Sequence, residues 1–142
     1  MKKENFEVLL IEDDEDDAEM TMYTLAKLKD LHVTHINDGN EAITYLLDDH
    51  AMLPDLILLD LKMPKVDGVE VLRRIKAHLE RTHIPVIAFI SSPQGRAYLE
   101  SFQLRADAYL MKPVDVTSFL IAASAAGMTN INLSVKELHQ GR

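Results

Sequence analysis

The sequence contains no cysteine and no tryptophan among its 142 residues. Without cysteine the chain cannot form a disulfide, a thiolate metal site or a cysteine nucleophile. No apolar run approaches the ~20 residues of a membrane-spanning helix, and the polar, acidic N-terminal stretch is not typical of a signal peptide. Only 15 lysines and arginines face 23 acidic residues, giving a net charge of -8. This balance argues against nucleic acid as a direct partner. We therefore expect a cytoplasmic protein that binds neither membrane nor nucleic acid.

Short apolar runs alternate with amphipathic segments along the whole chain. Alternation with short connections predicts right-handed βαβ units, and hence a parallel sheet with helices on both faces. The length suits one α/β domain over residues 1–142, with a core at about 6–127 and a tail at 128–142 that can be partly helical. The predicted strands are residues 6–11, 32–36, 55–60, 84–90 and 106–111, and the predicted helices are 18–29, 41–47, 69–79, 94–104 and about 115–126.

The central strand ends at a carboxylate, Asp60, after a continuous apolar run. Such a run predicts a strand buried on both faces, and open α/β sheets place their chemistry at the carboxyl edge. The same edge would receive Glu12 and Asp13 from the first strand and Lys112 from the fifth. Crowded acids repel unless a cation neutralises them, and carboxylates, a carbonyl and waters suit Mg²⁺. A carboxylate in this setting can be the nucleophile of a phosphoryl transfer.

Three segments, in order at the ends of the expected strands, resemble the receiver domains of two-component response regulators. They are residues 8–14 (VLLIEDD), residues 60–64 (DLKMP) with Asp67-Gly68, and residues 109–113 (YLMKP). The resemblance covers about residues 7–126 and implies a flavodoxin-like (βα)5 fold with sheet order 2-1-3-4-5. Residues 14–19 (DEDDAE) are also similar to stand-alone receivers associated with bacterial phytochromes.

The resemblance also implies a role for each matching residue. Asp60 would be the phosphoacceptor, and Lys112 would contact the phosphoryl group. Tyr109 matches an aromatic residue that changes rotamer on activation. The implied Mg²⁺ ligands are Asp13, Asp60, Glu12 through water and the backbone carbonyl of Lys62.

The end of the fourth strand departs from the family pattern. The family usually places Thr or Ser five residues after the proline that begins this strand, but counting from Pro85 gives Ile90. The hydroxyl of Ser91 comes one residue late, and adjacent strand residues face opposite ways. Either a local irregularity brings Ser91 into the site or the hydroxyl is missing. Its loss would affect switching more than phosphorylation.

Three functions are compatible with these residues. The first is a single-domain response regulator that accepts a phosphoryl group on Asp60 from a histidine kinase or phosphotransfer protein. It would catalyse at most its own phosphorylation and dephosphorylation. The second is a non-switching, receiver-like adaptor, which Ile90 favours, and the third is a Mg²⁺-dependent phosphohydrolase. The absence of a second Asp two residues after Asp60 weakens the third.

The expected partners follow from the first function. The kinase could be a phytochrome-type photoreceptor. The stretch after Ala126 is expected to be too short for a DNA-binding output module, so the output would be a protein contact or a homodimer. The fourth helix, fifth strand and fifth helix are the expected contact face.

Other polar residues receive a simpler interpretation. We expect Glu15, Asp16 and Asp17 to be a solvated helix start. His32 and His35 are three residues apart in a strand, so they should point to opposite faces and make a poor metal pair.

Overall fold

The computed structural model describes residues 5–61, 67–78 and 80–128. Five strands alternate with five helices in the described chain, as the sequence predicts. The elements are β1 (Phe6–Ile11), α1 (Glu15–Leu25), β2 (Leu31–Ile36), α2 (Gly39–Leu47), β3 (Leu56–Asp60), α3 (Gly68–Ala77), β4 (Val86–Ile90), α4 (Gln94–Glu100), β5 (Ala108–Met111) and α5 (Val116–Ala125).

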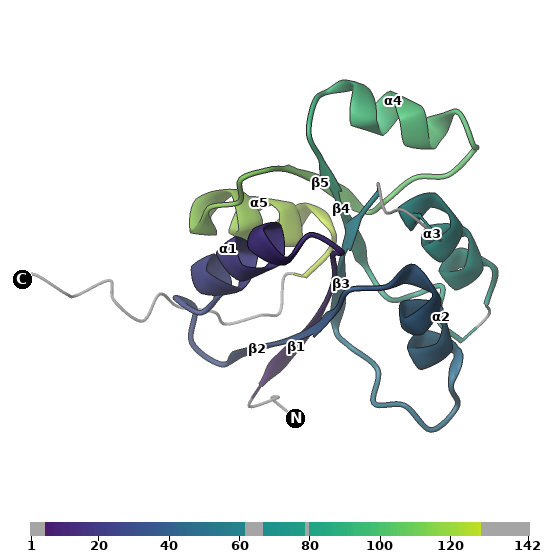
Figure 1. Cartoon of the computed structure of the whole chain (residues 1–142), viewed down its shortest axis with the longest axis horizontal. Helices are drawn as coiled ribbons and strands as arrows, with labels where there is room; N and C mark the ends of the chain where they lie inside the picture. The colour runs from purple at the N-terminus through teal and green to yellow at the C-terminus, as the bar shows by residue number, and fades with distance from the viewer. Residues whose placement is uncertain (1–4, 62–66, 79, 129–142) are drawn as a thin grey trace, which may run out of the picture.

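The five strands form one parallel sheet in the order β2-β1-β3-β4-β5. Figure 1 shows this sheet between two layers of helices, with α1 and α5 on one side and α2 and α3 on the other. The flavodoxin-like fold and its strand order are therefore confirmed. Strand β3 is central, so its carboxyl end lies beside the ends of both β1 and β4.

The alternation of side chains along β3 explains how one strand supports both layers. Leu56 and Leu58 pack in the cluster that includes α1 and α5, whereas Ile57 and Leu59 pack with α2, α3 and α4. All four are fully buried. Burying an aliphatic side chain contributes roughly 1.5–3 kcal/mol, so β3 is strongly fixed. Asp60 is thus held at the end of the most buried strand.

Several predicted helix boundaries differ from the observed ones by a few residues, and two of the differences have a clear local cause. Helix α1 begins earlier than predicted because the Asp14 side chain accepts a hydrogen bond from the Asp17 amide at 2.9 Å and caps it. Helix α4 ends at Glu100, earlier than predicted, and Gln103 has a left-handed φ of 62° that a continuing helix does not allow.

The predicted tail beyond residue 128 lies outside the described residues. Within the part that the structure covers, no helix has the length and apolar character needed to cross a membrane.

Candidate functional site

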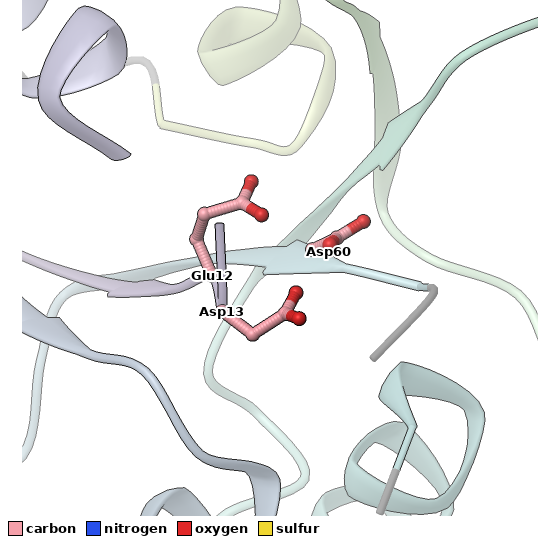
Figure 2. Close-up of side chains that lie close together, drawn as sticks. All are labelled: Glu12, Asp13 and Asp60. Atoms are coloured by element: carbon pink, nitrogen blue, oxygen red, sulfur yellow. The ribbon is translucent and has the colours of Figure 1, made fainter. Parts of the chain in front are cut away.

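Three carboxylates meet where β1 and β3 end. Asp60 is the last residue of β3, and Glu12 and Asp13 directly follow β1. The parallel register of the two strands brings these ends to one edge of the sheet. Figure 2 shows the three side chains gathered around a common space. One oxygen from each carboxylate lies within 4.8 Å of the others.

Glu12 is the most buried member of this group. Its side chain has no exposed surface, and its Oε1 atom has no well-formed hydrogen bond within the described chain. Its backbone is fixed at both polar atoms. The Glu12 amide donates to the Ile36 carbonyl at 3.1 Å, and its carbonyl oxygen lies 2.7 Å from Nε2 of His35. The carboxylate is therefore held at a defined place, where burial makes a nearby positive charge favourable.

Lys112 supplies that charge from the residue after β5. Its Nζ lies 2.8 Å from Glu12 Oε1, 3.0 Å from Asp17 Oδ2 and 3.9 Å from Asp60 Oδ1. It also lies 5.6 Å from the centre of the Phe89 ring. Burial lowers the pKa of Lys112, but the hydrogen-bonding and charged carboxylates outweigh burial and raise the pKa above its ordinary value. The ammonium is thus firmly charged.

The contact with Asp17 corrects one expectation from the sequence. Asp17 is not simply a solvated helix residue, because its carboxylate accepts a hydrogen bond from Lys112 across 95 positions of sequence. A run of six acids gives no signal that distinguishes this member from its neighbours. Its position one turn into α1 is what directs it toward the end of β5.

The pair Asp67-Gly68 brings α3 close to the back of Asp60. The Asp67 side chain caps α3 by accepting from the Glu70 amide at 3.2 Å. The Gly68 amide donates to the Leu61 carbonyl at 3.0 Å. A Cβ at position 68 would overlap the Asp60 carbonyl oxygen and lie 2.6 Å from Leu61 Cα. Only glycine permits this approach, which fixes the backbone of Asp60.

Ile90, and not Ser91, is the last residue of β4. In register, Asp60 lies opposite Phe89 on β4, and Ile90 lies opposite Met111 on β5. Ile90 is partly buried and packs against the core, whereas Ser91 is exposed. A pocket of about 650 Å³ at the strand ends is lined by both residues as well as by Asp60 and Lys112. The strand therefore continues regularly through the position where a hydroxyl is expected, and that position holds an aliphatic side chain.

Tyr109 lies on β5 and lines a different pocket, between β5 and α5. Its hydroxyl accepts a hydrogen bond from the Ala106 amide at 3.2 Å, and the Arg96 guanidinium lies 5.1 Å from the ring centre. The ring is half-buried. Tyr109 thus connects β5 to α4 through Arg96.

The donor set at the strand ends suits a hard divalent cation. It consists of the Glu12, Asp13 and Asp60 carboxylates, of which Glu12 Oε1 is buried and lies 2.8 Å from the Lys112 ammonium. Oxygen donors of this kind are what Mg²⁺ prefers. The predicted contribution of the Lys62 carbonyl falls outside the described residues. His32 and His35 contact different residues: His32 Nδ1 lies 2.8 Å from Glu7 Oε1, and His35 Nε2 lies 2.7 Å from the Glu12 carbonyl oxygen.

Comparison with known proteins gives consistent relatives. The chain is 30% identical to the regulatory protein AtoC of Escherichia coli (strain K12) over 133 residues, which cover 93% of this chain but only 28% of AtoC. It is 33% identical over 110 residues to the response regulator Rcp1 of Synechocystis sp. (strain ATCC 27184 / PCC 6803 / Kazusa), covering 74% of this chain and 75% of Rcp1. The chain therefore spans about a quarter of one relative and most of the other.

Solved structures agree with these relatives. The bacteriophytochrome response regulator AtBRR superposes with a TM-score of 0.80 at 36% identity, covering 88% of this chain and 94% of that one. The Mn(2+)-bound form of the response regulator Rcp1 superposes with a TM-score of 0.69 at 27% identity, covering 92% and 99%. The family model for the response regulator receiver domain matches residues 8–124. With its 2-1-3-4-5 sheet and this match over most of its length, the chain belongs to the family of response regulator receiver domains.

Proposed function

We propose that this receiver accepts a phosphoryl group on Asp60 and signals through contacts with other proteins. One observation carries the proposal. The Asp60 carboxylate ends the central strand with Glu12 and Asp13 on one side, and with the Lys112 ammonium 3.9 Å away on the other. This arrangement combines a nucleophilic carboxylate, a set of oxygen donors for a cation and a fixed positive charge, which together are the requirements of phosphoryl transfer.

Each residue would have a distinct task in the transfer. An oxygen of Asp60 attacks the phosphorus of a phosphohistidine, a P–O bond forms, and the P–N bond breaks with its electron pair leaving on the imidazole nitrogen. Lys112 balances negative charge on the phosphoryl oxygens. Asp13 and Asp60 would hold Mg²⁺ directly, and Glu12 would hold it through water. When bound, the ion would offset the charge of the acids and of the incoming phosphate.

A second candidate is a receiver-like adaptor that does not switch. The packing of Ile90 favours it. Gly95, on the first turn of α4, lies so close to Ile90 that an added Cβ would be 2.6 Å from Ile90 Cγ2. Helix α4 thus rests on an apolar side chain at the position where a phosphate-binding hydroxyl is expected. A phosphoryl group on Asp60 would have no hydroxyl of residue 90 to draw toward itself.

The output surface that we propose is the face formed by α4, β5 and α5. Met111 and Ile121 are 46% and 65% exposed there, and both line the pocket that also contains Tyr109 and Arg96. Exposed apolar side chains rimmed by arginine suit a protein contact. A downstream protein or a second copy of the chain could use this face. The likeness to AtBRR, a bacteriophytochrome response regulator, supports a phytochrome-type histidine kinase as the phosphoryl donor.

Labelling with acetyl phosphate tests the proposed chemistry. The wild type should gain one phosphoryl group in the presence of Mg²⁺, detected by intact-protein mass spectrometry, and much less in EDTA. Asp60→Asn should not be labelled, because the amide is not a nucleophile of comparable strength.

Asp55→Asn is a matched control at the opposite end of the same strand. The Asp55 side chain accepts from the Glu7 amide at 2.8 Å, and an asparagine oxygen can still accept this bond. The Asp55→Asn variant should be labelled like the wild type. Failure to label the wild type would leave the adaptor as the better candidate, whereas multiple turnover on small phosphoesters would favour a phosphohydrolase.

A further inference from the structure

We propose that Asp17 is a positioning residue that holds the Lys112 ammonium in a resting place and competes for it with the phosphoryl group on Asp60. The inference rests on the proposed function, because it concerns how the phosphoryl site is tuned. Asp17 lies outside the carboxylate cluster of Glu12, Asp13 and Asp60. Its link to the site is the ion pair with Lys112.

The distances show which acids hold Lys112 at rest. Its Nζ is within 3.0 Å of Glu12 and Asp17 but 3.9 Å from Asp60, which is beyond hydrogen-bond reach. The ammonium is therefore held by the two acids of the β1–α1 region and is only a Coulombic neighbour of Asp60. Phosphorylation would place ~1.5 to 2 negative charges at Asp60, and these charges would attract the same ammonium.

Of the two carboxylates that hold Lys112, Asp17 is the one that can release it. Glu12 is fully buried, with both backbone polar atoms bonded. The Asp17 side chain is 42% exposed, so water can solvate its carboxylate when Lys112 leaves it. Helix α1 nevertheless presents it in a fixed direction, because the Asp17 amide is held by the Asp14 cap.

The consequence is that Asp17 weakens the interaction between Lys112 and the phosphoryl group. When the phosphoryl oxygens attract the Lys112 ammonium, its ion pairs with Glu12 and Asp17 must weaken or be shared. Removing the Asp17 charge should therefore strengthen phosphoryl binding through Lys112. Because the pair is half-exposed and solvent screens it, we expect a modest effect of about threefold.

Titration with beryllofluoride in the presence of Mg²⁺ measures this effect without chemistry. Beryllofluoride mimics the phosphoryl group, and bound and unbound forms can be followed by fluorine NMR. Asp17→Asn should half-saturate at about threefold lower beryllofluoride than the wild type. Asp16→Asn removes the same charge from the neighbouring exposed position and should match the wild type. Asp17→Glu, which keeps the charge and can still reach Lys112, should return close to the wild-type value.

A Lys112→Gln background separates positioning from general charge. There Asp17→Asn should have no effect, because the residue acts only through the ammonium. An equal effect in both backgrounds, or equal binding by Asp17→Asn and Asp16→Asn, would overturn the inference while leaving the proposed function intact. A wild type that does not bind beryllofluoride with Mg²⁺ would instead contradict the proposed function, and the inference would fall with it. Matching thermal unfolding midpoints of Asp17→Asn and wild type exclude misfolding as the cause.

Discussion

The two sides of the pocket at the strand ends differ in kind. The β1–β3 side carries three carboxylates, and Lys112 reaches them from the end of β5. The β4–α4 side carries Ile90 against Gly95, with the exposed Ser91 beyond. One side is charged and tightly held, and the other carries an apolar residue, Ile90, at the end of β4. If Asp60 accepts a phosphoryl group as proposed, the residues that accept it and the residues that respond to it are separable in this chain.

Both sides use a glycine to allow a close approach, but the neighbours differ. Gly68 approaches backbone atoms of Asp60 and Leu61, which cannot move without disturbing β3. Gly95 approaches the side chain of Ile90, where an added Cβ would lie 2.6 Å from Cγ2 and 2.7 Å from Cβ. The first contact fixes the backbone of Asp60, the proposed nucleophile, whereas the second involves the packing of a side chain. The comparison predicts that substitutions will be costlier on the side of β3.

Gly68→Ala should give the largest loss. The added methyl group would overlap the Asp60 carbonyl, and overpacking against backbone is expected to cost about 3 kcal/mol of unfolding free energy. Gly95→Ala should cost less, because it overlaps side-chain atoms of Ile90 and not the backbone, and because alanine favours the helix by ~1 kcal/mol. Urea denaturation of both variants measures the difference. Equal losses of unfolding free energy would mean that the close contacts of Gly68 and Gly95 are equally unable to adjust. In an Ile90→Ala background the cost of Gly95→Ala should fall, because the overlap with Cγ2 of Ile90 is removed while the overlap with Cβ remains, whereas the cost of Gly68→Ala should persist.

Lys112→Gln should have the next largest effect, on chemistry rather than on folding. Loss of the ammonium removes charge balance from the phosphoryl oxygens, and we expect acetyl-phosphate labelling to slow by about tenfold or more. Lys76→Gln is a control for general charge, because Lys76 pairs with Asp107 away from the strand-end cluster. The initial rate of phosphoprotein formation by mass spectrometry measures both. An unchanged rate in Lys112→Gln would mean that Lys112 does not assist the phosphorylation of Asp60.

Ile90→Thr should alter how the β4–α4 side of the pocket responds to phosphorylation and should leave phosphorylation itself unchanged. In the wild type, phosphorylation of Asp60 should shift the amide NMR signals of residues 94–104 little. Threonine supplies a hydroxyl that can donate to the phosphoryl group, so these shifts should grow, at a stability cost of about 1 kcal/mol for the lost apolar packing. Labelling of Asp60 should continue. Large phosphorylation-dependent shifts in the wild type would contradict the separation of the two sides. Ser91→Ala, measured in parallel, reports whether the serine hydroxyl substitutes for the missing one.

Much of this architecture can be predicted from the sequence, for local reasons. The apolar run before Asp60 is long enough to identify a strand buried on both faces, and the alternation of strands and helices determines the sheet type. The meeting of Asp13, Asp60 and the carboxyl end of β5 follows from parallel topology, because all of these ends lie at one edge. The Asp67-Gly68 pair is visible in the sequence, but the overlap that requires glycine appears only in the structure.

Contacts that depend on side-chain direction could not be predicted. Asp17 is one of six successive acids, and its partner Lys112 lies 95 positions away. Arg81 gave no signal at all, yet it is 4% exposed, and its Nε donates to the Leu46 carbonyl at 2.6 Å. Its guanidinium also donates to the Asp48 carbonyl at 3.2 Å and so holds the end of α2. A single arginine in a polar loop is ordinarily solvated, and only tertiary packing shows that this one is buried.

The smallest expected effect concerns the segment that carries Lys112 into α5. Asp115 caps α5 by accepting from the Ser118 amide at 2.7 Å, and this hydrogen bond lowers the pKa of Asp115 below its ordinary value. A lowered pKa in the folded state stabilises the fold above the pKa of the unfolded chain, near ~3.9. That contribution is lost as the pH falls through the lower, folded value. Asparagine can keep the capping bond but does not titrate. Urea denaturation of Asp115→Asn should therefore show a smaller loss of stability than the wild type between about pH 5 and pH 2. Asp16→Asn, on an exposed acid, should follow the wild-type curve. If Asp115→Asn also follows it, this cap adds no acid sensitivity.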